Sequence, residues 1–472
     1  MNWQTVIGLE VHVQLATRTK MFCGCATGYG EPPNTSVCPV CLGLPGALPA
    51  PNAEAVRLGT VAALALGCEV HTTSVFARKN YFYPDLPKGY QISQFDRPLA
   101  TGGVLLIESP DRGAIPVSIT RLHLEEDAGK SLHDRIPGHT AVDLNRAGTP
   151  LAEIVSGPDL QSPAEARAYL VTLRQLLVYA GVSECSMEKG SLRVDANLSV
   201  HLSGTPLGTK TEVKNLNSFA NVERALHAER ERQIALLDAG STVTQVTLTF
   251  NAATGAVKPL RSKEDSHDYR YFPDPDLPPL VLEPAWIAAV ESGLVELPAA
   301  RRERYQRVHA LAAYDVKVLT QEPAVADYFE LVVAAGVDAK IAANWVMGEV
   351  LAGWNEVRAF AVEPERLAAL IALVDEGAVS LQAAKRIYAE LGTSPDPPLA
   401  VAERLGLIQV RDGDALVGWV DEVVAAHPAE VARFRGGETK LTGFFVGQVM
   451  KKSAGKADPK AIQPILLARL RA

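Results

Sequence analysis

The spacing of apolar residues changes along this chain, and that change limits the folds that it can form. Two early segments, "TVIGLEVHVQL" and "VSITRLHLEE", alternate apolar and polar residues, as half-buried strands do. Other early segments, such as "SPAEARAYLVTLRQLLVYAG", have helical spacing, and from residue 299 to about residue 391 only helical spacing is found. Strands mixed with helices, followed by helices alone, predict an α+β protein.

One early helix has recognisable ends. Ser162 is placed to cap it, Pro163 suits the first helical position, and Glu165 completes a capping box. Gly181 is placed to end it, because glycine readily takes the left-handed conformation that ends many helices. The segment "SFANVERALHAERERQIALLDAG" is expected to begin and end in a similar way.

Two proline clusters, "FPDPDLPPL" and "TSPDPP", indicate loops or linkers between domains. They divide the 472 residues into a large first part, a middle part and a tail with short helical stretches. We therefore expect three domains, at residues 1–292, 293–398 and 399–472.

Charge is unevenly distributed along the chain. The formal net charge is −8, but residues 433–472 hold nine Lys/Arg and two Asp/Glu, a net charge of +7, so the rest carries −15. A basic tail on an acidic body favours a polyanionic partner, and a solvated basic face is the other interpretation. The first residues do not resemble a signal peptide, and no apolar run approaches the about 18 residues of a membrane span. We expect a cytoplasmic protein with no membrane partner.

Two predicted strands carry acidic and imidazole side chains two residues apart. Glu10 and His12 share one strand face, and His123 and Glu125 repeat the arrangement. If these strands pair, several carboxylates converge and repel one another unless a cation lies among them. Oxygen ligands suit Mg²⁺, and an imidazole ligand makes Mn²⁺ suitable as well. An acidic strand edge facing water is the other interpretation.

Four of the six cysteines lie close together in the sequence: Cys23, Cys25, Cys38 and Cys41. Their C-x-C-x₁₂-C-x₂-C spacing and the "CPVC" turn indicate a tetrahedral Zn²⁺ site, which would be structural because no ligand position is left open. The other interpretation is four reduced cysteines near one another. Cys68 and Cys185 stand apart and are expected in the core.

Common catalytic motifs are missing. "AGKS" is not a P-loop, because Leu124 stands where that motif needs its first glycine. There is no Gly-x-Ser-x-Gly elbow and no recognisable setting for a cysteine nucleophile. We expect any ATP to bind without a Walker loop, and we find no sign that this chain hydrolyses an amide itself.

Several long segments closely resemble one known family, the B subunit of the tRNA-dependent aspartyl/glutamyl amidotransferase (GatB). The resemblance spans nearly the whole chain. Its motifs are "GLEVHVQL", "CPVCLGLPGALP", "KNYFYPDLPKGYQISQ", "RLHLEEDAGKSLHD", "NRAGTPLAEIVSGPD", "GSLRVDANLSV", "EVKNLNSF", "RSKEDSHDYRYFPDPDLPP" and "GFFVGQVMKKSAGKADP".

This resemblance implies a reaction. Such a subunit uses ATP to phosphorylate the side-chain carboxylate of Glu-tRNA(Gln), Asp-tRNA(Asn) or both, and ammonia then displaces phosphate from the acyl phosphate. The activity is that of a glutamine-hydrolysing ligase that forms a C–N bond. The resemblance also implies a heterotrimer in which an amidase A subunit supplies ammonia and a small C subunit supports the pair, with mischarged tRNA as substrate. A non-discriminating aminoacyl-tRNA synthetase is a further candidate partner.

Two rival interpretations remain open at this point. The chain could be a non-catalytic, zinc-stabilised tRNA-binding scaffold, although a scaffold does not need the paired acid and imidazole strands. It could also be a stand-alone ATP-dependent ligase, which the missing ammonia source disfavours. ATP hydrolysis stimulated by mischarged tRNA, with and without an A subunit, separates these interpretations.

The resemblance also implies a layout. It assigns residues 1–292 to a catalytic domain, a mainly antiparallel sheet cradle with flanking helices that contains the kinase/transamidase site and the zinc knuckle. It assigns residues 293–398 to an all-helical domain and residues 399–472 to a small, basic, tRNA-binding tail domain similar to YqeY.

The family motifs then map onto individual residues. Glu10, His12 and Glu125 match the family's Mg²⁺ or Mn²⁺ site. Lys79 and Lys88 are catalytic candidates that could contact ATP phosphates or the acyl phosphate, or line the ammonia route. The remaining candidates for substrate and nucleotide binding are Tyr81, Tyr83, Tyr90, Asn145, Arg146, Arg193, Lys214 and Asn215. The candidates for tRNA contact in the tail are Lys451, Lys452, Lys456 and Lys460.

Three positions depart from the usual family pattern. The segment "QVTL" replaces Gln-Glu-Thr-Arg, Lys189 replaces an acid, and Leu144 replaces a tyrosine. These changes put local contacts in doubt, and not the reaction.

Overall fold

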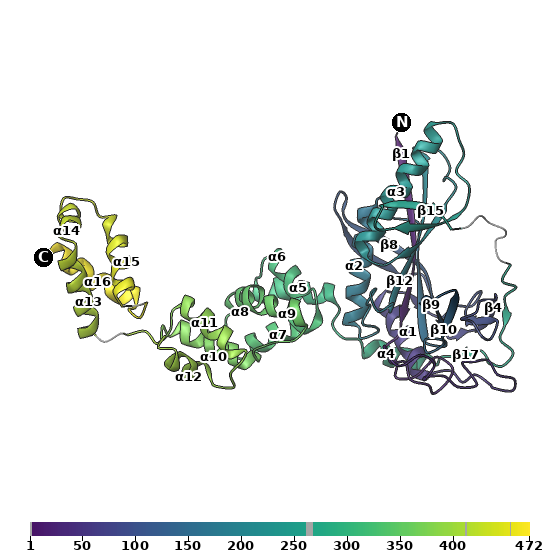
Figure 1. Ribbon diagram of the computed structural model, residues 1–472, viewed down its shortest axis with the longest axis horizontal. Helices are drawn as coiled ribbons and strands as arrows, with labels where there is room; N and C mark the ends of the chain where they lie inside the picture. The colour runs from purple at the N-terminus through teal and green to yellow at the C-terminus, as the bar shows by residue number, and fades with distance from the viewer. Residues whose placement is uncertain (1, 261–267, 411–412, 454) are drawn as a thin grey trace. The chain divides into compact units, whose positions relative to one another are not determined.

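A computed structural model describes residues 2–260, 268–410, 413–453 and 455–472 of the protein (Figure 1). Residues 261–267, which begin the motif "RSKEDSHDYRYFPDPDLPP", lie outside the described residues. The chain forms two compact units, Met1–Ala300 and Arg301–Ala472. Among the described residues, no helix is both long and apolar enough to cross a membrane.

The first unit is built on a ten-stranded sheet with the order β15-β14-β13-β12-β1-β11-β8-β6-β2, and β7 also pairs with β8. All neighbours are antiparallel except β13 and β14, so the expectation of a mainly antiparallel α+β domain is confirmed. The strands are β1 (Trp3–Gln14), β2 (Glu69–Val70), β6 (Ala100–Thr101), β7 (Val104–Ser109), β8 (Gly113–Glu126), β11 (Pro150–Ser156), β12 (Leu192–Leu202), β13 (Thr211–Leu216), β14 (Thr247–Asn251) and β15 (Ala256–Pro259).

Shorter strands form three small sheets beside the large one. Their orders are β16-β4-β5, β9-β10 and β17-β3. These strands are β3 (Thr73–Ser74), β4 (Ala77–Asn80), β5 (Tyr90–Ser93), β9 (Lys130–Ile136), β10 (His139–Asp143), β16 (Phe272–Pro273) and β17 (Leu280–Val281). The "AGKS" segment leads into strand β9 and not into a helix, which agrees with the exclusion of a P-loop.

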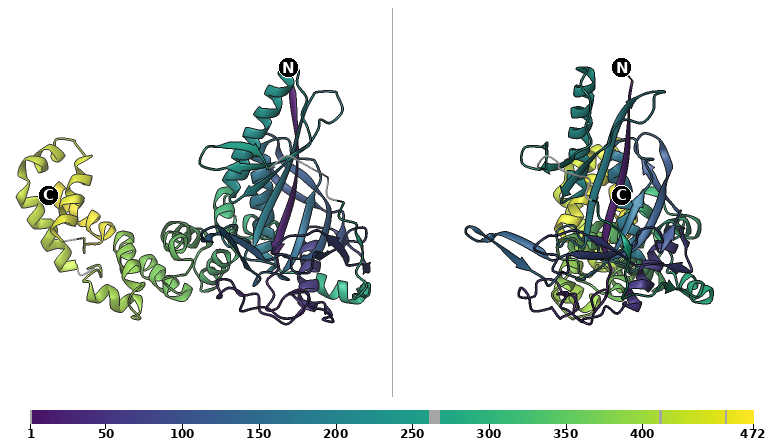
Figure 2. Two further views of the ribbon diagram at one scale, coloured as in Figure 1. Left: turned by 45° about the vertical axis from the view of Figure 1, so that its right-hand side comes forward. Right: turned by 90° about the vertical axis from the view of Figure 1, so that its right-hand side faces the viewer.

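The two faces of the large sheet differ in character. Along β1, the odd-numbered residues from Ile7 to Val13 are buried, whereas Glu10 and His12 alternate with them on the other face. Helices α2 (Pro163–Tyr179) and α3 (Phe219–Asp238) cover the apolar face (Figures 1 and 2). The opposite face is thus left to polar side chains from the same strands.

Helix α2 begins as predicted, with one difference. The Ser162 hydroxyl accepts a hydrogen bond from the Glu165 backbone N–H at 3.2 Å, which caps the helix. The Glu165 carboxylate does not return to Ser162. It accepts instead from the Gln161 N–H at 2.7 Å and from Arg112, so the predicted capping box is only half formed. Gly181 ends the helix with a φ of +67°, as expected.

Helix α1 (Ala53–Ala65) packs closely on strand β8 because one of its residues lacks a side chain. A Cβ atom on Gly59 would lie 2.6 Å from Leu124 Cδ2 and 3.1 Å from Leu99 Cδ2. The first separation is shorter than real Cβ contacts, so a larger residue here would force Leu124 to move. Leu124 immediately precedes Glu125, and this contact therefore fixes the strand that carries part of the polar site.

Helices make up the second unit, as predicted. They are α5 (Pro298–His309, which begins in the first unit), α6 (Ala313–Leu319), α7 (Pro323–Ala334), α8 (Ala339–Trp345), η1 (Val346–Val350), α9 (Leu351–Val357), α10 (Pro364–Asp375), α11 (Leu381–Leu391), α12 (Pro398–Arg404), α13 (Gly413–Ala426), α14 (Pro428–Arg435), α15 (Leu441–Lys452) and α16 (Pro459–Arg471). The first unit also contains α4 (Pro284–Ser292), which packs on α1.

The second unit contains two separate apolar cores. One includes Tyr305, Phe329 and Val401, and the other includes Phe445 and Leu466. Helix α12, which begins at Pro398, packs with the first of these cores, so this core includes residues that follow position 398, the end of the expected middle domain. The "TSPDPP" segment is also held in place, because Arg366 donates to the carbonyl oxygens of residues 391, 394 and 396.

Candidate active site

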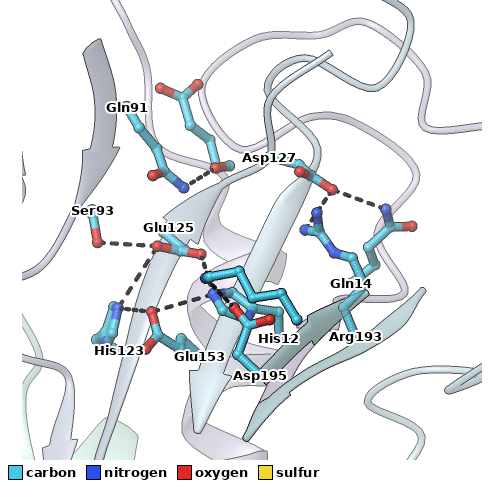
Figure 3. Close-up of polar contacts among 12 residues, drawn as sticks. His12, Gln14, Gln91, Ser93, His123, Glu125, Asp127, Glu153, Arg193 and Asp195 are labelled. Atoms are coloured by element: carbon cyan, nitrogen blue, oxygen red, sulfur yellow. Dashed lines mark hydrogen bonds and ion pairs between the residues drawn. The ribbon is translucent and has the colours of Figure 1, made fainter. Parts of the chain in front are cut away.

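Three neighbouring strands bring acidic and imidazole side chains into one row on the polar face of the sheet. His12 on β1 lies directly opposite Glu153 on β11, and Glu153 lies directly opposite His123 on β8. Glu125 follows on the same face of β8 (Figure 3). We expected β1 and β8 to approach each other, and the structure places β11 between them, antiparallel to both.

The side chains in this row are in direct contact. His12 Nε2 lies 3.4 Å from Glu125 Oε1 and 3.4 Å from Glu153 Oε2. His123 Nε2 lies 3.0 Å from Glu153 Oε2 and 3.7 Å from Glu125 Oε2. The Ser93 hydroxyl donates to Glu125 Oε2 at 3.2 Å (Figure 3). Each of the two carboxylates therefore lies close to both imidazoles, and Glu125 also accepts a hydrogen bond from a hydroxyl.

Burial and charge shift the pKa values of this row in opposite directions. Burial alone would raise the pKa of Glu125 and Glu153, but hydrogen bonds and charge from the two histidines outweigh it and lower both values. Burial alone would lower the pKa of His123, but hydrogen bonds to Glu125 and Glu153 raise it to about 9. The two histidines thus favour the ionised form of both buried carboxylates.

The donor set fits a small divalent cation. His12, Glu125 and Glu153 each offer a ligand atom, and these atoms lie within 4.8 Å of one another. An octahedral ion with ligand distances of about 2.1 Å places its ligands about 3–4 Å apart, so a small contraction would suffice. We call these three residues the metal triad. His123 donates to Glu153 and orients it, and His123 Nδ1 is buried without a partner among the described residues.

Glu153 was missing from the predicted site, and Glu10 was included. Glu10 lies on the same face, but it accepts a hydrogen bond from Asn197 at 3.1 Å and is outside the metal triad. Burial and the charge of Glu153 raise the pKa of Glu10. The signal for Glu153 is present in the sequence, because an acid in the middle of the apolar strand "PLAEIVS" is unusual.

The two candidate lysines have different surroundings. Lys79 Nζ lies 4.8 Å from the ring centre of Tyr269. Burial alone would lower the pKa of Lys79, but the charges of Tyr271 and Glu125 raise it, which places this ammonium within electrostatic reach of the metal triad. Lys88 instead forms an ion pair with the buried Glu126. Lys88 is therefore neutralised by a protein carboxylate, whereas Lys79 has no such partner among the described residues and can bind an anionic ligand.

Aromatic rings gather around Lys79. Tyr81 packs edge-on against Tyr83 and Tyr269, and its hydroxyl lies 3.5 Å from Gln91 Oε1. Tyr83 is 63% exposed, whereas the Tyr90 ring stacks on the Arg78 guanidinium at 4.1 Å. The structure also adds rings that the sequence did not single out, namely Tyr269 and the stacked pair Phe95 and Tyr271.

Three other candidates support loops around the site. Asn145 accepts from the Ser36 N–H at 2.8 Å and donates to the Pro32 carbonyl at 2.7 Å, so it braces the cysteine loop. Arg146 donates to the carbonyl oxygens of residues 128 and 129. Arg193 forms an ion pair with Asp127 at 2.9 Å (Figure 3).

The last two candidates lie on β13, which is separated by β12 from the strand that carries His12. Lys214 Nζ lies 2.8 Å from Asp195 and 2.9 Å from Glu212. Its neighbour Asn215 is exposed and has a φ of +64°, at a register shift where two residues of β13 oppose Asp195 on β12. These contacts engage Lys214 with protein carboxylates.

The four clustered cysteines meet in space, as expected. The Sγ atoms of Cys23, Cys25, Cys38 and Cys41 lie within 4.8 Å of one another, and the Cys38 N–H points at Cys41 Sγ at 3.1 Å. Tetrahedral Zn–S bonds of about 2.3 Å place sulfur atoms about 3.8 Å apart, so the cluster can bind a metal such as zinc. The two remaining cysteines, Cys68 and Cys185, are buried in the core of the first unit, as predicted.

A buried lysine completes the cysteine cluster. Lys20 is fully buried, and its ammonium lies 2.7 Å from the Ser36 carbonyl oxygen and 3.6 Å from Cys41 Sγ. Four thiolates and one Zn²⁺ carry a net charge of −2, which this ammonium partly neutralises. Sequence reasoning missed Lys20, which stands three residues before Cys23.

The three departures from the family pattern are all accommodated locally. Leu144 contributes its backbone, with its N–H donating to Asn34 and its carbonyl oxygen 3.4 Å from Lys20 Nζ. Lys189 forms an exposed ion pair with Glu184 at 2.7 Å. The segment "QVTL" runs into β14, where the Thr247 hydroxyl donates to Glu212. None of these contacts touches the metal triad.

The candidate lysines of the tail lie at adjoining helix ends and are exposed. Lys451 and Lys452 end helix α15, and Lys460 lies in the first turn of α16. Lys456 lies between these helices. Lys452 is 2.5 Å from Glu422, so part of this positive charge is already paired within the protein.

Known proteins resemble this chain over its whole length. Residues 5–288 match the GatB/GatE catalytic domain, and residues 327–470 match the GatB domain. The chain is 50% identical over 479 residues to a Geobacter sulfurreducens protein named as the B subunit of aspartyl/glutamyl-tRNA(Asn/Gln) amidotransferase. Proteins of the same name from Moorella thermoacetica and Chlorobium limicola are 50% and 48% identical, and all three comparisons cover 100% of both chains. A catalytic-domain match over more than half of the chain, together with full-length similarity to these subunits, means that this protein belongs to the GatB family.

Proposed function

We propose that this chain is the B subunit of a tRNA-dependent amidotransferase, and that its metal triad is where ATP activates the carboxylate of a mischarged tRNA. The observation that carries this proposal is the metal triad itself, in which two carboxylates and one imidazole each offer a ligand atom and these atoms lie within 4.8 Å of one another. The alternative of a non-catalytic scaffold does not account for such a costly arrangement.

The chemistry requires activation before amidation. A carboxylate does not react with ammonia, because oxide is too poor a leaving group. In the first step a carboxylate oxygen attacks the γ-phosphorus of ATP and ADP leaves. In the second step ammonia attacks the acyl carbon, phosphate leaves and a proton is lost. When bound, Mg²⁺ or Mn²⁺ would neutralise charge on the transferred phosphoryl group.

The chain's own residues have separate tasks in this scheme. His12, Glu125 and Glu153 would hold the cation, while His123 and Ser93 keep the two carboxylates in place. Lys79 would contact the phosphoryl group or the acyl phosphate. The negative charge of Glu125 acts on its ammonium, and that ammonium has no carboxylate partner within ion-pair distance among the described residues. The exposed ring of Tyr83 and its neighbours would position the nucleotide or the terminal adenosine.

The rest of the chain would serve assembly and substrate binding. We assign a structural Zn²⁺ to the cysteine cluster and phosphate contacts with tRNA to the tail lysines. An amidase A subunit would supply ammonia and a small C subunit would complete a heterotrimer in the cytoplasm. Glu-tRNA(Gln), Asp-tRNA(Asn) or both would be the substrates.

The experiment that tests this function measures ATP cleavage stimulated by mischarged tRNA in the assembled complex. Glu125→Gln should abolish this cleavage, while glutamine hydrolysis by the A subunit continues. Glu54→Gln is the matched control, because Glu54 is an exposed residue on helix α1 that pairs with Arg57. This change should leave both activities intact. If Glu125→Gln cleaved ATP at the wild-type rate, the triad would not be the kinase site and the scaffold interpretation would be favoured.

A further inference from the structure

Arg121 lies on the polar face of the sheet, next to His123 along β8 and diagonal to Glu153 of the metal triad. It precedes His123 by two residues on β8, so both side chains project from the same face. Its direct neighbours across the sheet are Val155 on β11 and Thr101 on β6, neither of which carries charge. The row of Arg121 and Val155 lies two residues, or about 7 Å, along the strands from the row of His123 and Glu153, and an arginine side chain can cover that span.

The Arg121 guanidinium has no partner within the described part of the chain. Its Nε is buried and makes no hydrogen bond. None of its nitrogens takes part in an ion pair or hydrogen bond with a described residue, although carboxylates are numerous on this face. The residue as a whole is half-buried, and a buried donor without a partner costs free energy that an anion bound beside it would recover.

Other cations around this face are already engaged by the protein. Lys88 pairs with Glu126, Arg193 pairs with Asp127, and Lys214 pairs with Asp195. Arg146 donates to two backbone carbonyl oxygens. Lys79 and Arg121 differ from these four because each lacks a carboxylate partner within ion-pair distance among the described residues. They therefore supply the positive charge that is left for an anionic ligand.

We propose that Arg121 binds the phosphoryl group that is transferred from ATP at the metal triad. A guanidinium offers planar, paired N–H donors that match two oxygens of one phosphate, and it stays protonated beside metal ligands. Arg121 would hold the oxygens that gain charge as ADP leaves, while Lys79 approaches from the aromatic side. This inference rests on the proposed function, since it assigns a residue to the phosphoryl transfer described there.

The proposal is tested in the assembled amidotransferase with Arg121→Met and Arg121→Lys. Loss of charge-assisted hydrogen bonds should lower kcat/KM for ATP in tRNA-stimulated cleavage by about 10- to 150-fold in Arg121→Met. Arg121→Lys should recover part of this loss, because it restores the charge without the paired donors. Equilibrium binding of ATP should weaken in the same order. Glutamine hydrolysis by the A subunit should persist in both variants.

Arg57→Met is the matched control, because Arg57 is an exposed arginine on helix α1 that pairs only with Glu54 among the described residues. It should change neither ATP binding nor cleavage. Guanidinium ion added to Arg121→Ala should restore part of the cleavage rate, which a purely structural role would not predict. If Arg121→Met impairs folding, Arg121→Lys decides the question.

The possible failures are distinguishable. Wild-type kcat/KM and ATP affinity in Arg121→Met or Arg121→Lys would overturn this inference and leave the proposed function standing. If the wild-type complex itself showed no ATP cleavage stimulated by mischarged tRNA, the proposed function would fall, and the assignment of Arg121 would fall with it.

Discussion

Replacing Lys20 by methionine should weaken metal binding by the cysteine cluster. Lys20 is fully buried and donates to the carbonyl oxygen of Ser36 at 2.7 Å and toward Cys41 Sγ at 3.6 Å. Methionine has a similar length and keeps the packing, but it removes the only ammonium that we find at the cluster among the described residues. The net charge of −2 on a four-thiolate zinc site would then lose its buried counter-charge.

The size of the effect follows from two opposing contributions. Attraction between buried opposite charges a few ångströms apart amounts to several kcal/mol, but burying the ammonium costs a comparable amount. What remains is close to the net value of hydrogen bonds to a charged group, about 1.5–3 kcal/mol. Since about 1.4 kcal/mol is a factor of ten, Lys20→Met should bind Zn²⁺ about 10- to 150-fold more weakly than the wild type.

Competition with a chromogenic chelator measures this change directly. Lys189→Met is the matched control, because Lys189 is an exposed lysine that pairs with Glu184 and has no contact with the cysteines. It should bind Zn²⁺ like the wild type. A Lys20→Met protein that bound Zn²⁺ within twofold of the wild type would refute the role given to Lys20, and a wild-type protein without affinity for Zn²⁺ would refute the zinc site itself.

Three further predictions concern stability and tRNA binding. Cys38→Ser should lower both the zinc content and the temperature of unfolding, because ligand loss removes metal-coupled folding energy, and unchanged values in metal analysis and calorimetry would contradict this. Burial alone would raise the pKa of Glu330, but hydrogen bonds from two arginines and a tyrosine have the larger effect. The pKa is therefore lowered from 4.5 to about 2. Stability from a lowered pKa is present above the unfolded value and is lost as the pH falls through the folded value, so Glu330→Gln should unfold more easily than the wild type near pH 7. That difference in unfolding temperature should shrink between about pH 4.5 and pH 2, and a constant difference would argue against the assignment. Combined Lys451→Ala and Lys452→Ala changes should weaken tRNA binding and reduce its salt slope by about 0.7–0.9 for each phosphate that is no longer neutralised, whereas an unchanged slope in filter binding would mean that these lysines are only a solvated surface.

Local patterns in the sequence predicted local structure well. The alternation around Glu10 and His12 and around His123 and Glu125 placed each pair on one strand face, because side chains alternate strictly along a strand. The helix that starts at Ser162 was also placed correctly, because its cap depends on residues only a few positions apart. The cysteine cluster was predicted for a related reason, since short spacings limit how far its thiols can separate.

The composition of the metal triad could not be predicted in the same way. Whether Glu10 or Glu153 joins His12 depends on strand order, and strand order is decided by contacts between residues more than a hundred positions apart. Inserting β11 between β1 and β8 brings Glu153 opposite both histidines and leaves Glu10 with Asn197. The only local indication in the sequence was Glu153 itself, an acidic residue in the middle of an otherwise apolar strand.

Lys20 and Arg121 were missed for a different reason. Their significance lies in what surrounds them: a full set of acceptors for Lys20 and, within the described part of the chain, none for Arg121. Burial and hydrogen-bond partners are properties of the folded chain, and an isolated lysine or arginine in a sequence is most often a solvated surface residue.

Binding of Mn²⁺ to the assembled complex, followed by electron paramagnetic resonance without ATP, tests the central claim most directly. We predict one site whose affinity falls at least about 10-fold in Glu153→Gln, because a ligand is lost, and far less in Glu10→Gln, because Glu10 lies outside the triad. Equal Mn²⁺ affinity in wild type and Glu153→Gln, or a greater loss in Glu10→Gln, would contradict the assignment of His12, Glu125 and Glu153 as the metal site.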